Sequence, residues 1–203
     1  MNINKLSPEE ISIKLGTLAR REPDNPYPPT LLDGPKQSAA VLIPLLRYAD
    51  EWHILYIRRT EIEGDRHSGQ VAFPGGVCDP VDGNAEEAAL RETQEELRIH
   101  PNDVTILGKL NEHITITNFW VTPIVGLIPW PYSLTPAPKE VSRAFTIPLS
   151  WLNNPSNREE KLRELPNGKA VNVIYFEKYD GEYLWGASAR FTLTFLNVLN
   201  SRV

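Results

Sequence analysis

The chain has 203 residues, of which 41% are hydrophobic and 23% charged, and its net charge is −5. This length and composition are typical of one globular domain with a substantial core, and the negative charge disfavours a general binder of nucleic acids or anionic membranes. The single cysteine, Cys78, excludes an intrachain disulfide, and without a signal peptide or a long apolar run the sequence favours a cytoplasmic location.

The first 37 residues predict a helix followed by a connector. The segment SPEE, residues 7–10, combines an N-cap serine, a proline at the first helical position and a capping-box glutamate, and Ile11 and Leu15 follow at helical spacing. The prolines of EPDNPYPP, residues 22–29, forbid a helix and favour an extended chain. We expect both segments to be appendages of one domain spanning residues 1–203.

Apolar runs rich in β-branched and aromatic residues predict strands before and after a central helix. These runs are residues 39–46 and 52–59, then the segments that begin at Val104 and Phe119, and finally a late hairpin of residues 171–176 with 183–185. The segment from Ser188 onward fits both a strand and a helix, and a helix is favoured because Ser188 can cap it. Because no βαβ rhythm repeats, we expect an α/β fold with a mixed sheet and helices on both of its sides.

The segment RETQEEL, residues 91–97, concentrates glutamates on a predicted helix. They are Glu92, Glu95 and Glu96. At about 100° per residue they share one face, where like charges repel by about 0.2–0.5 kcal/mol per pair, while Leu90 and Leu97 lie on the opposite face. We therefore expect the leucine face to pack and the acidic face, continued by Ala88 and Ala89, to stay open.

Two interpretations of the acidic face are open: a solvated surface, which is the commoner case, and a metal site. The residues before the helix favour the metal site. FPGG, residues 73–76, contains two glycines that allow a ligand to approach the backbone closely, and Asp79 and Asp82 add carboxylates. Hard oxygen ligands beside such a loop suit Mg²⁺ or Mn²⁺, held partly by carboxylates and partly by substrate phosphates.

The stretch GGVCDPVDGNAEEAALRETQEEL resembles the Nudix box, G-x5-E-x7-R-E-U-x-E-E-x-G-U, where U is aliphatic. Gly76 matches the first glycine, and residues 91–96 contain the Arg-Glu and Glu-Glu pairs. Asp82 replaces the early glutamate and is followed by one extra residue, which leaves a metal role for Asp82 open. Thr93 replaces an aliphatic residue and Arg98 the late glycine, changes that should affect only packing and the helix end.

The resemblance implies a Nudix-like α/β/α sandwich and a diphosphate hydrolase that depends on Mg²⁺ or Mn²⁺. It assigns metal binding to Glu92, Glu95 and Glu96, and the orientation of a carboxylate to Arg91. The general base differs among related enzymes, so Glu96 and Glu140 are both candidates, and Glu112 is a weaker third. Glu140 follows a proline-rich loop, which suits a residue that swings over bound substrate.

The upstream segment LYIRRTEIEGDRHSGQVAFPGG, residues 55–76, resembles the signature of coenzyme A pyrophosphatases, a Nudix subfamily. Asp65 stands where that signature has an internal arginine, and Arg66 is next to it. The resemblance implies that coenzyme A or an acyl derivative is cleaved into 3′,5′-ADP and 4′-phosphopantetheine. It assigns substrate binding to Arg59, Gly69, Phe73, Gly75 and Gly76.

Two other functions stay open. One is a pyrophosphatase for another nucleoside diphosphate derivative, such as ADP-ribose or a dinucleotide. The other is a non-catalytic ligand sensor, which the retained Arg-Glu and Glu-Glu pairs disfavour. We expect a small-molecule partner and neither a nucleic-acid nor a membrane partner, and a homodimer is left open.

Overall fold

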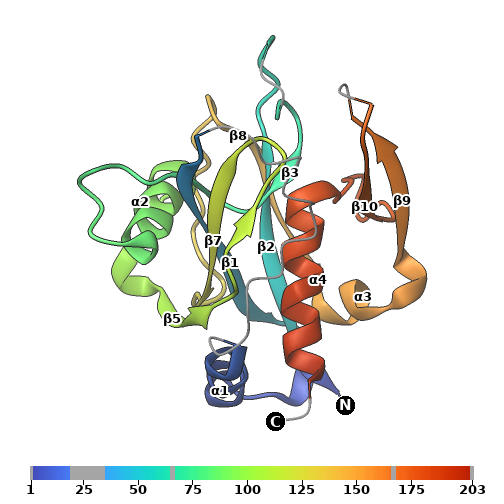
Figure 1. The fold of residues 1–203 in the computed structure, drawn as a ribbon. Helices are drawn as coiled ribbons and strands as arrows, with labels where there is room; N and C mark the ends of the chain where they lie inside the picture. The colour runs from blue at the N-terminus through green and yellow to red at the C-terminus, as the bar shows by residue number, and fades with distance from the viewer. Residues whose placement is uncertain (1, 19–34, 65–66, 166–167, 202–203) are drawn as a thin grey trace.

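The computed structural model describes residues 2–18, 35–64, 67–165 and 168–201 (Figure 1). The predicted connector at residues 22–29, and Asp65 with Arg66, lie outside these ranges. Within them, no helix is both long and apolar enough to cross a membrane.

A mixed eight-stranded sheet forms the centre of the molecule. Its main path runs through β3 (Val71–Ala72), β2 (Glu51–Arg59), β1 (Gln37–Tyr48), β7 (Phe119–Leu127) and β5 (Thr105–Lys109). Three further strands attach to it: β4 (Gly75–Val77) to β1, β6 (His113–Ile114) to β7, and β8 (Val141–Pro148) to β2. β1 and β7 run parallel, whereas the other pairs are antiparallel, which confirms the predicted mixed sheet.

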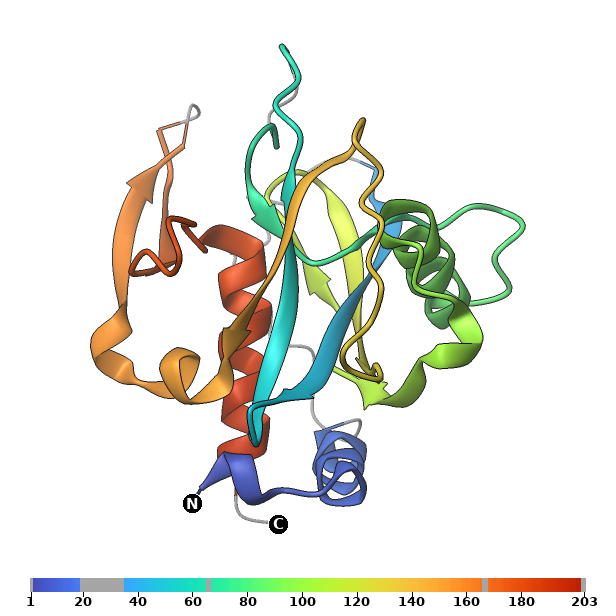
Figure 2. The same ribbon diagram turned by 180° about the vertical axis from the view of Figure 1, so that it is seen from behind.

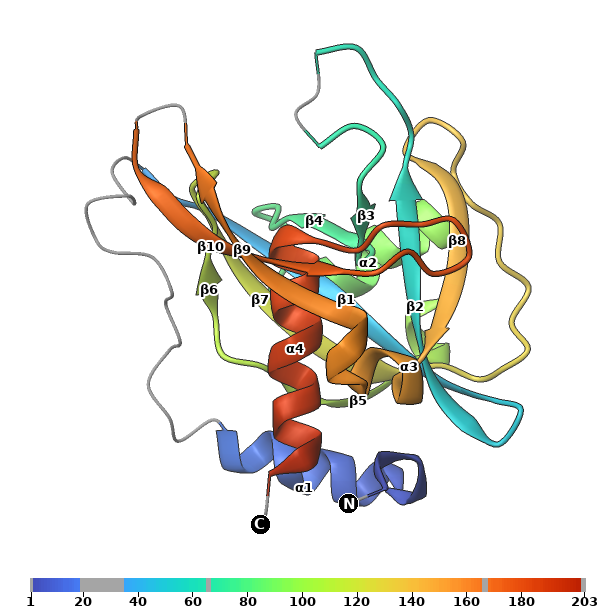
Figure 3. The same ribbon diagram turned by 90° about the vertical axis from the view of Figure 1, so that its right-hand side faces the viewer.

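Helices cover both faces of this sheet, as the side view in Figure 3 shows. α2 (Ala85–Leu97) lies behind the sheet in that view and α4 (Gly186–Asn200) lies in front of it. α1 (Pro8–Leu18) packs beside β5, and α3 (Leu149–Asn153) packs against β2. The short 3₁₀ turns are η1 (Ile3–Lys5), η3 (Pro101–Asp103) and η4 (Pro155–Asn157).

The predicted N-terminal helix and the first two predicted strands are confirmed. The Glu10 amide donates a hydrogen bond to Ser7 Oγ at 3.2 Å, and the Ser7 amide donates to Glu10 Oε2 at 2.8 Å, so the capping box starts α1. The strands predicted over residues 39–46 and 52–59 are β1 and β2, joined by Ala49 and Asp50 at φ of 49° and 61°. Two left-handed residues in a two-residue turn match the twist of an antiparallel hairpin.

The late hairpin was predicted with the wrong partner strand. β10 (Ala170–Phe176) pairs along its length with β9 (Arg158–Glu164), while residues 183–185 supply only one bridge, between Tyr175 and Trp185. The sequence REEKLRE of β9 has no apolar alternation that would predict a strand. The C-terminal helix is confirmed, but Ser188 does not cap it, because α4 already begins at Gly186.

α2 contacts the sheet through small side chains, so its predicted orientation was wrong in part. Ala88 and Ala89 do not extend an open face; both are fully buried. They pack with Ala40, Leu42 and Ile124 of the sheet. Leu97 is buried as expected, whereas Leu90 is only half-buried. Side chains no larger than a methyl group allow the backbone of α2 to lie close to β1.

The two changes at the end of the box act locally, as predicted. Thr93 is fully buried, and its hydroxyl donates to the Ala89 carbonyl at 2.6 Å, so the polar group is satisfied inside the helix. Arg98 ends α2 in a left-handed conformation at φ 61°, with its amide bonded to the Gln94 carbonyl. That is the conformation for which the glycine of the box pattern is best suited.

We predict that Leu97→Ala lowers the free energy of unfolding by about 2–5 kcal/mol, because it opens a cavity in the core. Leu90→Ala should cost clearly less, since part of that side chain is already in contact with water. Urea denaturation of both variants measures the difference. Equal losses would mean that α2 is rotated relative to its orientation in this structure.

Candidate active site

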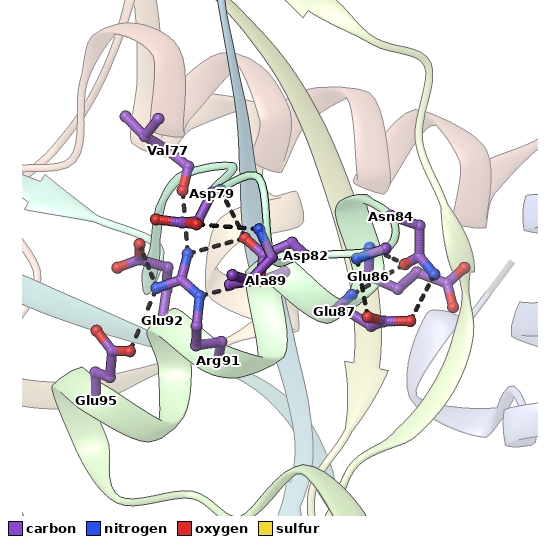
Figure 4. A network of polar contacts seen from close by, with 12 residues as sticks. Val77, Asp79, Asp82, Asn84, Glu86, Glu87, Ala89, Arg91, Glu92 and Glu95 are labelled. Carbon is purple, nitrogen blue, oxygen red and sulfur yellow. Dashed lines mark hydrogen bonds and ion pairs between the residues drawn. The ribbon is translucent and has the colours of Figure 1, made fainter.

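Arg91 is the centre of a polar network at the start of α2 (Figure 4). Its Nε and Nη2 atoms donate to the two carboxylate oxygens of Asp82, each at 3.0 Å, and the Asp82 side chain is only 5% exposed. The Arg91 Nη1 atom donates to Glu92 Oε1 at 2.9 Å and to Glu95 Oε1 at 3.3 Å. Arg91 therefore orients two of the box glutamates, as the resemblance implies.

Asp82 fixes Arg91 from the side opposite the glutamates. The bidentate hydrogen bond from Arg91 lowers the pKa of Asp82, and the Asp79 amide donates a further bond to Asp82 Oδ2 at 2.7 Å. This pairing was not predicted from the sequence, where Asp82 was weighed only as a metal ligand. Here its carboxylate serves as the partner of Arg91.

Glu96 lies beneath the glycine turn and is 2% exposed, so the expectation of an open acidic face is wrong for this residue. Its Oε2 atom accepts a hydrogen bond from the Gly75 amide at 3.0 Å. Burial, together with the nearby Glu92 and Glu140 carboxylates, raises the pKa of Glu96 to about 8, while the Gly75 amide acts in the opposite direction. The side chain of Glu95, by contrast, is 54% exposed.

Gly75 is required by a close backbone contact within the protein, whereas a side chain at Gly76 would have to displace the flexible end of Glu92. Gly75 has φ of 146°, and a Cβ atom there would lie 2.4 Å from the Ala40 carbonyl oxygen of β1. A Cβ atom on Gly76 would lie 2.5 Å from the Glu92 carboxylate carbon. Burial raises the pKa of Glu92 as well, and the hydrogen bond from Arg91 partly opposes this shift. The predicted approach of a ligand to these glycines stays a prediction.

The loop that carries Glu140 reaches the α2 glutamates from β8. The Glu140 carboxylate lies close enough to Glu92 and Glu96 to raise the pKa of both. The Glu140 carbonyl accepts from the Thr60 amide at 2.9 Å, its amide donates to the Ala137 carbonyl at 2.9 Å, and the Ala137 amide donates to the Glu96 carbonyl at 2.8 Å. The backbone of Glu140 is thus hydrogen-bonded on both sides, and the expected movement over bound substrate stays a prediction.

The upstream signature meets the box at Arg59, the last residue of β2. The Arg59 guanidinium lies near enough to Glu96 to lower the pKa of that carboxyl. Its amide bonds to the Gln70 carbonyl at 3.0 Å, which joins the end of β2 to the segment that leads into the glycine turn. The structure thus gathers Arg59, Glu140, Glu96 and the Gly75 amide around one place.

Three further predicted residues have structural contacts of their own. Phe73 is 3% exposed and packs on Tyr56 with ring centroids 4.9 Å apart, so it supports the glycine turn from the core. Gly69 forms a turn at φ 67°. Glu112 accepts from Trp120 Nε1 at 2.6 Å and lines a cleft of about 360 Å³ whose wall also includes Asp82.

The carboxylates provide the hard oxygen donors that suit Mg²⁺ or Mn²⁺. Among the described residues, no three acidic, histidine or cysteine side chains already converge on one point. Glu92 and Glu95 are held by Arg91, and Glu96 by the Gly75 amide. The donor chemistry therefore fits a divalent cation, which would favour the charged carboxylates that burial, and to a lesser extent the neighbouring carboxylates, disfavour at Glu92 and Glu96.

We predict that Gly75→Ala lowers the free energy of unfolding by about 1–3 kcal/mol, the usual cost of overpacking, because a Cβ atom there would clash with the β1 backbone. Gly16→Ala is the matched control, because a Cβ atom in that position of α1 meets nothing within 4 Å. The control should gain up to about 1 kcal/mol from its higher helix propensity. Thermal denaturation compares the two, and a Gly75→Ala protein as stable as the parent would refute the contact.

Comparisons with known proteins identify the family of the chain. A family model described as NUDIX domain matches residues 36–183. A protein of Photorhabdus laumondii named "Uncharacterized Nudix hydrolase NudL" is 36% identical over 164 residues, covering 81% of this chain and 86% of its own. The protein of the same name from Escherichia coli K12 is 36% identical over 153 residues, covering 75% and 78%. The solved Nudix hydrolase RenU of M. smegmatis is 18% identical, with a TM-score of 0.48 over 58% of this chain and 74% of that one.

Proposed function

The chain belongs to the Nudix family of pyrophosphohydrolases, and we propose that its substrate is coenzyme A or an acyl-coenzyme A. Hydrolysis of the diphosphate would release 3′,5′-ADP and 4′-phosphopantetheine or its acylated form. The observation that carries the proposal is the proximity of Arg59 to Glu96, because it joins the coenzyme A signature to the Nudix box. The rest of the substrate assignment rests on the resemblance of residues 55–76.

Each residue of the site has a role in this proposal. Glu92, Glu95 and Glu96 would hold Mg²⁺ or Mn²⁺, which when bound neutralises charge on the diphosphate and activates water. Arg91, held by Asp82, keeps Glu92 and Glu95 directed to the same place. Arg59 would bind the substrate phosphates, and Gly75 and Gly76 present backbone without a Cβ atom in the way.

Glu140 is the better of the two candidates for the general base. Glu96 is buried and already accepts a hydrogen bond from the Gly75 amide, which suits a metal ligand. Glu140 is exposed while its backbone is fixed near both Glu92 and Glu96, so its carboxylate can reach a water molecule in the site. A base needs that contact with the attacking water.

The substrate is tested by incubating the purified chain with Mg²⁺ or Mn²⁺ and coenzyme A, acetyl-coenzyme A, ADP-ribose or NADH. Mass spectrometry of the products should show 3′,5′-ADP and a phosphopantetheine from coenzyme A, with a higher kcat/KM than for the other substrates. A higher kcat/KM for ADP-ribose or NADH would select the alternative nucleoside diphosphate substrates. Absence of hydrolysis with all of these would refute the substrate assignment.

We predict that Glu95→Gln and Glu96→Gln each lower kcat by orders of magnitude in Mg²⁺ while the circular dichroism spectrum stays that of the parent. Each change removes one metal-binding charge, and neither removes an apolar core contact. Glu86→Gln is the control, because Glu86 is an exposed residue in the first turn of the same helix. Near-normal turnover of either Glu95→Gln or Glu96→Gln would contradict the assigned metal site.

We predict that Glu140→Gln lowers kcat with little effect on KM or on metal affinity, because it removes an interaction that forms in the transition state. The loss should shrink as the pH rises, since hydroxide can replace the missing base. Steady-state kinetics across a pH series, with metal affinity measured by calorimetry, test this. Weaker metal binding, with kcat restored at saturating Mn²⁺, would instead identify Glu140 as a ligand.

A further inference from the structure

β9 is an edge strand whose outer side is open. In the described part of the chain its only strand partner is β10, and every residue after Arg158 is exposed. Figures 1 and 2 both show β9 at the outer margin of the molecule. Its only large apolar side chain, Leu162, is 72% exposed. An open edge with exposed backbone groups is a template for another strand.

The charges of β9 are complementary to a second copy of the same strand. The sequence REEKLRE has opposite charges at two and at three residues on either side of Lys161. In an antiparallel pair centred on Lys161, Arg158 would face Glu164 of the other copy, and Glu159 would face Arg163. By symmetry each of these favourable pairs occurs twice.

Other alignments of the two strands are electrostatically worse. An antiparallel pair centred on Leu162 would place Glu160 opposite Glu164 and Lys161 opposite Arg163, which are like charges. In a pair centred on Glu160, the only favourable contact is between Glu159 and Lys161 of the other copy, and the two copies of Glu160 face each other. Parallel pairing brings identical residues side by side. Like charges directly opposite each other destabilise a sheet, so the pattern selects the register centred on Lys161.

The register centred on Lys161 contains one unfavourable pair, Lys161 with Lys161 of the second copy, and the structure holds this ammonium group away from the open edge. Two copies of Lys161 would meet at the symmetry axis. The Lys161 ammonium, however, pairs with Glu159 of its own strand and lies 5.9 Å from the ring centroid of Tyr175 in β10. Its charge is thus displaced toward β10, on the side away from the second copy.

Both arginines keep donors for the partner. The Arg158 Nη1 atom donates to the Leu152 carbonyl at 3.2 Å, which uses one of its five N–H groups. The Arg163 guanidinium lies 5.0 Å from the ring centroid of Trp185. Stacking of this kind uses the face of the guanidinium and leaves the N–H groups on its edge for a carboxylate.

We propose that β9 pairs antiparallel with β9 of a second copy, in the register centred on Lys161, so that the two hairpins form one continuous sheet in a homodimer. The two Leu162 side chains lie on one face at diagonal positions, about 7–8 Å apart, where each covers part of the other. α2 and β9 are on opposite sides of the molecule, so both candidate active sites stay accessible (Figure 1). Because the contact is short and charged, the dimer is weak and dissociates further in high salt.

Sedimentation equilibrium of the full chain tests the proposal up to about 1 mM, the weak end of measurable protein affinities. The parent should show a monomer–dimer equilibrium that 1 M NaCl shifts to monomer, since salt at about that concentration screens exposed charges beyond about 3 Å. Glu159→Arg and Arg163→Glu should each raise the dissociation constant about tenfold or more, because each turns two attractive pairs into repulsive ones. The variant with both changes should dimerise like the parent.

A mixture of the two single variants gives an independent measurement. In the mixed dimer each arginine faces a glutamate again, so equimolar Glu159→Arg and Arg163→Glu should form a heterodimer more tightly than either variant forms a homodimer. Unchanged melting temperatures and unchanged kcat establish that the fold and the distant site are intact. A parent that stays monomeric at every concentration, or a dimer that the charge reversals do not affect, overturns the proposal independently of any result on hydrolysis.

Discussion

The close packing of α2 against the sheet is the constraint on which the site depends. Ala88 and Ala89 let the helix approach β1, Gly75 lets β4 lie close to the β1 backbone, and Gly76 leaves room for the Glu92 carboxylate of the helix. Between these contacts the Glu96 carboxylate is removed from water and is held by the Gly75 amide. A buried carboxylate without a cation is costly, and the raised pKa of Glu96 means that its charged form is disfavoured at this place. Such a cost is expected where a binding site requires the charge.

Arg91 and Asp82 hold the carboxylates of the site in place through hydrogen bonds. The guanidinium is shared between Asp82 on one side and Glu92 with Glu95 on the other, and its planar donors fit both contacts at once (Figure 4). Arg59 and Glu140 add one charge of each sign close to Glu96. The residues that approach the site therefore come from β2, α2 and the loop before β8, which are far apart in the sequence and are joined by backbone hydrogen bonds.

The sequence was most informative where a pattern has one structural meaning. The capping box at Ser7, the β1–β2 hairpin and the helix that carries the glutamates were all predictable from local residue preferences. The rotation of α2 about its axis was not predictable. Leucine is more hydrophobic than alanine, which favoured burial of Leu90, but the close packing of the helix on the sheet requires the small side chains of Ala88 and Ala89. β9 was missed since its residues are almost all charged and gain nothing from burial. The pairing of Asp82 with Arg91 depends on a loop conformation that residue spacing alone does not specify.

The central claim is that the α2 carboxylates form a cation site whose repulsion is relieved by binding. The most direct measurement is the free energy of unfolding as Mg²⁺ or Mn²⁺ is added, compared with NaCl at equal ionic strength. Binding to the folded state alone must stabilise it increasingly with cation concentration. We predict that the divalent ions stabilise the parent well beyond the effect of NaCl, and that Glu96→Gln loses most of this difference. Equal stabilisation by NaCl and by the divalent ions would contradict the account.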